Sequence, residues 1–188
     1  MTKPTTKNNT KVQKVYPMKN IIIFLCLFTL SLLGQYQPVS KKGELIKHTY
    51  YTLSYVEEHE QANWVYYQIR EGGYHRKDDF RIDEDVSTGS ATLEDYEGSN
   101  LHRGHMCPAA AMGFSKQAIS ETFCMSNISP QFGSFNRGIW KTLENRVRNL
   151  SIKGTTHVVT GPIFRDNIKT IGDNKVTVPG YYYNVQTT

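Results

Sequence analysis

The feature that most constrains the fold is a single strong helical period set between two β-rich stretches. Between Asn136 and Leu150, apolar residues recur at spacings of four, four and three, which gives a helix one apolar stripe: Ile139, Leu143, Val147 and Leu150. A second set recurs every four residues along an adjacent face: Asn136, Trp140, Glu144 and Arg148. The pattern predicts a helix that turns one face to a core and gathers polar side chains beside it.

Segments rich in Tyr, Val and Thr lie on both sides of this helix. Tyr50–Val56 and Trp64–Ile69 are predicted strands, and residues 157–164 and 174–185 are β-rich stretches broken by Gly-Pro and Pro-Gly turns. A short helix is predicted over Ser115–Phe123, with its first residue as the N-cap. Because the strands are grouped and do not alternate with helices, we expect an α+β fold: a mostly antiparallel sheet flanked by helices.

The first 34 residues have the pattern of an export signal. Residues 20–34 are uncharged and strongly apolar, Lys residues precede them and a polar stretch follows. The run is shorter than the roughly 20 residues of a membrane-spanning helix. We therefore predict an N-terminal extension and signal peptide over residues 1–34, translated from Met1 or Met18, and a periplasmic or extracellular protein. The alternative is an uncleaved membrane anchor, which would be the chain's one contact with a membrane.

The rest of the chain has the size and composition of one domain. Residues 35–48 are predicted as a linker or first strand, and residues 49–188 as the domain itself. An aromatic content of 12% supplies apolar mass for a core and excludes wholesale disorder. Three Cys are too few for a disulfide-stapled miniprotein. Whether Cys107 and Cys124 form a disulfide is left open, as is the oligomeric state.

Bulk charge does not identify a partner. The net charge of +5 comes from five Lys in residues 1–34, and the remaining chain has 17 basic and 17 acidic residues. Residues 77–100 hold eight acidic and two basic residues and are predicted as a surface loop. Residues 101–150 hold six basic and two acidic residues. Attraction of a polyanion must therefore be local.

Three short clusters carry side chains suited to phosphodiester hydrolysis. His105 is a candidate general base, since neutral imidazole can take a proton from water, and activity should then fall below a pH near 6.5. Arg103 offers a forked cation for phosphate oxygens. Asn136 and Glu144 offer the hard oxygen ligands that Mg²⁺ prefers. Together they fit metal-assisted hydrolysis, although each residue alone also fits a structural role.

Four motifs, in this order and spacing, resemble the DNA/RNA non-specific endonuclease family: HRGHMCPAAAM, ETFCMSNISPQ, FNRGIWKTLE and HVVTGPIF. The resemblance covers about Tyr50 to Val185. It implies a ββα-metal (His-Me finger) site and an endonuclease that cleaves DNA and RNA through phosphate contacts, without sequence specificity. It also implies one Mg²⁺ as cofactor, with Mn²⁺ or another divalent cation as a substitute.

The resemblance implies a role for each matching residue. His105 matches the family's general base, and Asn136 matches the single protein ligand of the metal. Glu144 matches the acidic residue that holds the metal through water. Asn127 matches an asparagine that supports the geometry of metal and base. Three arginines match positions that contact the phosphate: Arg76, Arg103 and Arg148.

Two departures from the family pattern and two alternatives accompany this hypothesis. His102 stands where the family usually has Asp, which implies an altered site geometry. The chain ends soon after YYYNV, a strand that family members follow with further sheet, so we expect the C-terminal strands to be missing. One alternative is a catalytically weakened nucleic-acid-binding relative. The other is a zinc-stabilised binding module with four ligands: His102, His105, Cys107 and Cys124.

Overall fold

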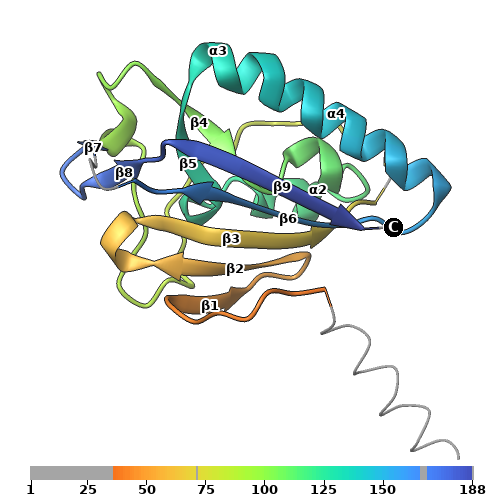
Figure 1. Ribbon diagram of the computed structural model, residues 1–188, viewed down its shortest axis with the longest axis horizontal. Coiled ribbons are helices and arrows are strands. Elements are labelled where there is room, and N and C mark those ends of the chain that lie inside the picture. Colours follow the sequence, from red (N-terminus) through yellow and green to blue (C-terminus); the bar gives the residue numbers. More distant parts are fainter. Residues whose placement is uncertain (1–35, 71, 166–168, 188) are drawn as a thin grey trace, which may run out of the picture. The chain divides into compact units, whose positions relative to one another are not determined.

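Five strands form one antiparallel sheet in the order β1-β2-β3-β6-β9 (Figure 1). The computed structural model describes residues 36–70, 72–165 and 169–187. The strands span β1 Glu44–Lys47, β2 Tyr51–Val56, β3 Gln61–Gln68, β6 His157–Ile163 and β9 Tyr181–Thr187. These elements confirm the predicted strands on both sides of the helix, and β1 lies within residues 35–48, the stretch predicted as a linker or first strand. The α+β fold with an antiparallel sheet is confirmed.

Two smaller antiparallel hairpins complete the β structure, β4 Leu101–His105 with β5 Ile128–Phe132 and β7 Lys169–Ile171 with β8 Val176–Val178. The sequence did not predict β4 or β5. The HRGH motif lies on β4, and Gly104 pairs with Ser129. A Cβ at Gly104 would lie 2.2 Å from the buried side chain of Gln131, so a larger residue here would have to displace that side chain.

Helices lie with the β4–β5 hairpin on one side of the sheet (Figure 1). Helix α2 spans Lys116–Glu121, and Ser115 caps it by accepting a hydrogen bond from the backbone N–H of Ala118, as predicted. The long helical segment joins α3 Gly133–Phe135, η5 Asn136–Trp140 and α4 Lys141–Leu150. Single turns are η1 Glu57–His59, η2 Glu94–Tyr96, η3 Ala109–Met112, η4 Met125–Asn127 and η6 Ser151–Lys153.

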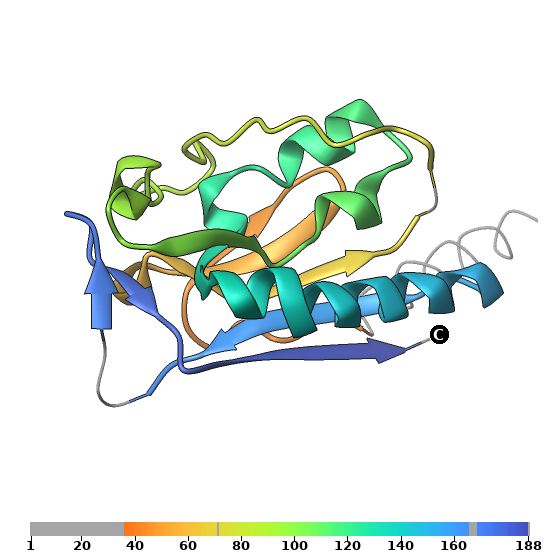
Figure 2. The ribbon, with the colours of Figure 1, turned by 90° about the horizontal axis from the view of Figure 1, so that it is seen from above.

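The long helix departs from its predicted apolar stripe at one residue. Gly138 has non-helical backbone angles, φ −96° and ψ −111°, so the helix kinks there. The placement of Ile139 on the buried stripe was wrong, because its side chain is 66% exposed. Trp140 takes the inward position and packs against Phe135 and Tyr182 of β9. After the kink, α4 runs along β6 and β9 (Figure 2).

The acidic segment 77–100 is more than the predicted surface loop. Asp83, Val86, Asp95 and Tyr96 are buried. The segment has no regular apolar period, so its few inward side chains gave no sequence signal. Its buried carboxylates are held by hydrogen bonds, as buried charges require.

The N-terminal predictions, the extension and signal peptide of residues 1–34 with either start, lie outside the described residues. Within the described ranges, the helices are too short or too polar to cross a membrane. Cys107 and Cys124 are both buried and both free.

Candidate active site

Six of the seven predicted site residues line one groove with a volume of about 900 Å³: Arg76, Arg103, His105, Asn136, Glu144 and Arg148. Strand β4 supplies one wall and the η5–α4 helix supplies the facing one. The four-residue spacing on the helix explains why three of its polar side chains face the same groove. The loop before η2 adds Arg76.

His105 is the last residue of β4 and is 7% exposed. Its ring packs against the rings of Phe80 and Phe123, with centroid distances of 5.6 and 4.8 Å. Its Nε2 atom is buried and has no hydrogen-bond partner among the described residues. Burial, with the charges of Arg76 and Arg103, lowers the pKa of His105 to about 3. This value lies well below the unperturbed value near 6.5 on which the expected fall in activity rests, and that fall stays a prediction.

Asn136 begins the kinked turn of the helix and faces His102 on β4. Its Nδ2 atom donates to Nδ1 of His102 at 3.4 Å. Its Oδ1 atom accepts no hydrogen bond from the part of the chain that the structure describes. The histidine that replaces the family's usual Asp thus contacts the amide that the sequence predicted as the metal ligand.

Glu144 lies one turn into α4 and is half-buried. Burial raises the pKa of this carboxyl group to about 7, although the positive charge of Arg148 opposes the rise. Arg148 itself is oriented by Asn145, whose Oδ1 accepts from the guanidinium at 2.8 Å. A carboxyl group with a pKa near 7 is only partly charged at neutral pH, and a bound cation would favour its charged form.

Two arginines of the groove lie over aromatic rings. Arg103 lies 4.4 Å from the centroid of Phe80, and Arg76 lies 5.1 Å from that of Phe123. Arg76 also pairs with Asp78 at 2.7 Å. Sequence reasoning missed Phe80, which contacts both His105 and Arg103. Its one signal was an aromatic residue inside the charged stretch HRKDDFRID.

The groove therefore places an unpartnered imidazole, three arginines, an amide and a carboxylate around one space that can hold a phosphodiester. A sequence profile of the DNA/RNA non-specific endonuclease family matches residues 33–188. The chain belongs to this family. Its β4–β5 hairpin and following helix form the ββα unit.

The relatives that this chain matches are nucleases by name. Mitochondrial endonuclease G of Homo sapiens is 34% identical over 152 residues, which cover 72% of this chain and 51% of that protein. A nuclease of Syncephalastrum racemosum is 37% identical over 150 residues, covering 74% of this chain and 46% of the relative. The chain thus spans about half the length of these curated relatives. A chain from the crystal structure of the EndoG/EndoGI complex, solved to explain EndoG inhibition, has a TM-score of 0.73 and 31% identity, covering 82% of this chain and 72% of that one.

Asn127 is the predicted site residue that does not line the groove. It is fully buried. Its Oδ1 accepts from the backbone N–H of Cys107 at 2.8 Å, and its Nδ2 donates to the carbonyl groups of Cys107 and Thr122. Asn127 thus fixes the backbone just after His105 and stays away from the groove itself.

The zinc-stabilised alternative fails on geometry. Its four ligands were His102, His105, Cys107 and Cys124. In the described ranges, one group of three metal-binding side chains has its ligand atoms within 4.8 Å of one another, and that group is His48, Asp83 and Cys124. The set around the HRGH motif does not converge.

Proposed function

We propose that this chain is an exported, Mg²⁺-dependent endonuclease that hydrolyses phosphodiester bonds of DNA and RNA without sequence specificity. The observation that carries the proposal is the groove, in which His105 faces the same space as the arginines and the Asn136–Glu144 pair. Family membership and the nuclease relatives support the same reaction. Arginine contacts to phosphate oxygens carry no information about base sequence.

The side chains of the groove fit a hard divalent cation. The contact of Asn136 Nδ2 with His102 orients the amide, and Oδ1 accepts no hydrogen bond from the described residues. Glu144 adds a carboxylate whose negative charge is disfavoured by burial and would be favoured again beside a cation. Oxygen ligands in small number are what Mg²⁺ takes from proteins. When bound, the ion would offset negative charge on the phosphate and on the leaving oxygen.

His105 acts as the general base in this proposal. Its ring is neutral at working pH, and the buried Nε2 atom can accept a proton from a water molecule that attacks phosphorus. The tilted contact with Phe80 and the edge-on contact with Phe123 restrict the orientation of the ring and thus the direction of Nε2. The arginines hold the phosphate and stabilise the charge that develops on it.

Substrate binding makes His105 a better base. Arg76 and Arg103 both lower the pKa of His105 in the free protein. A phosphodiester held between these arginines offsets their charge, so the pKa of His105 rises when substrate is bound. The arginines therefore bind the phosphate and link its arrival to the readiness of the base.

The test is digestion of plasmid DNA and of total RNA by the purified chain, with Mg²⁺, with EDTA and with the His105→Ala variant. We expect both polymers to be cleaved, EDTA to abolish cleavage, and the variant to lose at least ~100-fold in rate. The exposed His75, changed to Ala, is the matched control. A folded protein that binds but does not cleave either polymer would overturn the proposal and favour the weakened nucleic-acid-binding relative.

Export is proposed from residues 1–34 alone. The test is expression of the full chain and of a chain that starts at Gln35, followed by nuclease assays of the culture medium, periplasm and cell interior. We expect activity outside the cell interior for the full chain alone. Equal distribution of the two forms would contradict export.

A further inference from the structure

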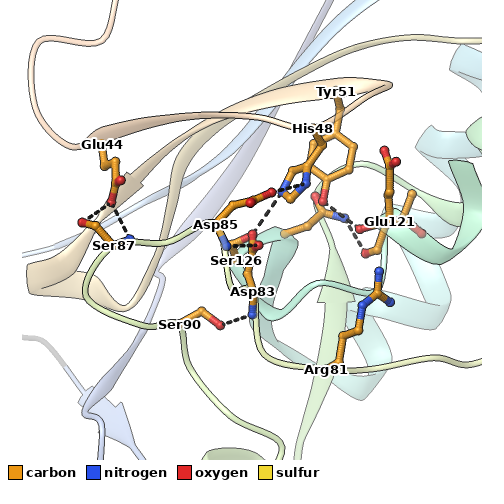
Figure 3. A network of polar contacts seen from close by, with 12 residues as sticks. Glu44, His48, Tyr51, Arg81, Asp83, Asp85, Ser87, Ser90, Glu121 and Ser126 are labelled. Atoms are coloured by element: carbon orange, nitrogen blue, oxygen red, sulfur yellow. Dashed lines mark hydrogen bonds and ion pairs between the residues drawn. The ribbon is translucent and has the colours of Figure 1, made fainter. Parts of the chain in front are cut away.

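A second cluster of polar side chains lies apart from the groove, where the turn after β1 meets the acidic segment. His48 follows β1, Asp83 and Asp85 belong to the acidic segment, and Cys124 precedes η4. Figure 3 shows His48 directed toward Asp83 and Asp85. The cavity at this cluster shares no lining residue with the candidate active site. Nothing in the proposed nuclease reaction uses these side chains.

Backbone contacts hold the cluster in place. The N–H of Arg81 donates to the carbonyl of Phe123 at 3.2 Å, and the N–H of Met125 donates to the carbonyl of Arg81 at 2.9 Å. These two bonds fix the acidic segment against the chain around Cys124. Three segments far apart in the sequence therefore meet in a preformed arrangement.

Three of these side chains offer nitrogen, oxygen and sulfur ligands to one point. The ligand atoms of His48, Asp83 and Cys124 all lie within 4.8 Å of one another. The side chains of His48 and Asp83 are 5% and 2% exposed, and Cys124 is 5% exposed with a free thiol. Tetrahedral zinc holds such ligands roughly 3.3–3.6 Å apart, so no separation between two ligand atoms has to shorten by more than about 1.5 Å.

Neighbouring groups orient the ligands as they do in zinc proteins. Nε2 of His48 faces Asp83 at 3.0 Å, while Nδ1 faces the carboxylate of Asp85 at 3.5 Å. The other oxygen of Asp83 accepts from the backbone N–H of Asp85 at 3.2 Å, and Ser126 donates to the first. A carboxylate on the far nitrogen of a ligand histidine fixes its tautomer and strengthens its binding.

An ion has a way in from solvent. A cavity of about 490 Å³ adjoins the cluster, and His48, Asp83 and Cys124 all line it. Water can supply a fourth ligand from this side. A thiolate and an imidazole favour zinc over magnesium, so this site and the candidate active site would select different metals.

We propose that His48, Asp83 and Cys124 bind a zinc ion that joins the β1–β2 turn, the acidic segment and the chain before η4. The ion would replace the hydrogen bond between His48 and Asp83 with bonds to the metal. Its role is structural, because it lies outside the groove and ties together segments that frame the fold. The proposal does not depend on the nuclease activity.

The first test uses Co²⁺ as a spectroscopic stand-in for zinc. We expect Co²⁺ added to the chelator-treated full chain to give a near-ultraviolet charge-transfer band from thiolate ligation, which one equivalent of Zn²⁺ removes. Cys124→Ser should lose the band. Cys107→Ser, which changes the other buried free cysteine, should keep it. No band, or a band that survives Cys124→Ser, would overturn the proposal and leave the cluster as a hydrogen-bond network.

The second test measures Zn²⁺ affinity by competition with a chromophoric chelator. We expect His48→Gln to weaken binding by more than tenfold, and Asp85→Asn by about tenfold, the cost typical of an outer partner. Asp85 is exposed, so the Asp85→Asn variant should fold and still tests the proposal even if changes at the buried ligands impair folding. Asn136→Ala should leave the affinity unchanged. Equal affinity in wild type and Asp85→Asn, or a loss in Asn136→Ala, would contradict a zinc site here.

Discussion

The candidate active site and the cluster of His48, Asp83, Asp85 and Cys124 both contain a buried histidine and carboxylates. They differ in whether these side chains have hydrogen-bond partners within the protein. In the groove, Nε2 of His105 has no partner among the described residues, and burial moves the pKa of both His105 and Glu144. In the cluster, both ring nitrogens of His48 face carboxylates, and Asp83 accepts several hydrogen bonds.

This difference distinguishes side chains that serve the reaction from side chains that stabilise the fold. A buried polar group without a partner costs free energy. Such groups are expected where the substrate or the catalytic cation supplies the missing partner, and paired groups are expected where they hold segments of the fold together. Substitutions in the groove should therefore lower the cleavage rate and leave stability unchanged. Substitutions at paired carboxylates should lower stability and leave the cleavage rate unchanged.

The largest expected effect is the shift in the pKa of His105. NMR titration of its ring in EDTA should give a pKa of about 3, because burial and two arginines oppose the charged form. An unfolded histidine takes its proton near pH 6.5. Acidification from about 6.5 to 3 therefore favours the unfolded state through this residue, and stability returns as the pH rises. A midpoint near 6.5 in the folded protein would show that the ring is not buried as described.

A smaller effect is expected at the predicted metal ligand. Asn136→Ala should raise the Mg²⁺ concentration for half-maximal rate by at least about tenfold, since loss of an outer partner alone typically costs that much. The measurement is a Mg²⁺ titration of plasmid cleavage, with the melting temperature as a check on folding. Asn149→Ala, an exposed change on the same helix, is the control. An unchanged titration would remove Asn136 from the metal site.

The smallest effect concerns a paired carboxylate outside both sites. Asp95 accepts hydrogen bonds from Thr92 and Asn174, and so ties η2 to the turn between β7 and β8. Asp95→Ala should lower the free energy of unfolding by about 1–3 kcal/mol, with rate spared. Urea unfolding measures this, with the exposed Asp173→Ala as the control. Equal free energies of unfolding for the two variants would contradict the claim that hydrogen-bonded carboxylates stabilise this fold.

The same carboxylate has a pH signature. Burial alone would raise the pKa of Asp95, but the hydrogen bonds from Thr92 and Asn174 hold it below its ordinary value. Its contribution to stability is therefore present above the unfolded pKa of about 3.9 and is lost as the pH falls through the folded pKa. Asp95→Ala should reduce the difference in stability between pH 7 and pH 3.

Sequence patterns predicted those features of the fold and the site that depend on residues close together in the chain. The four-residue period brought Asn136, Glu144 and Arg148 to one groove, and alternation located the strands of the sheet. The exposure of Ile139 was missed because a glycine backbone angle, and no side-chain pattern, sets the kink at Gly138.

Tertiary contacts decided the rest of the site. The β4–β5 hairpin pairs segments more than 20 residues apart, so neither strand had a turn signal beside it. The low pKa of His105 depends on Phe80 and Phe123, which reach the ring from other elements. Only the zinc-stabilised alternative placed Cys124 with the HRGH motif, and backbone pairing with the acidic segment puts this residue beside His48 and Asp83.

The most direct measurement is the initial rate of plasmid DNA cleavage by two histidine variants, with the melting temperature of each. We predict that His105→Ala loses at least ~100-fold in rate and keeps its melting temperature. His48→Ala should keep its rate at a temperature where it is folded and should melt at a lower temperature. A His105→Ala variant that cleaves DNA at the wild-type rate would contradict the assignment of the groove as the active site.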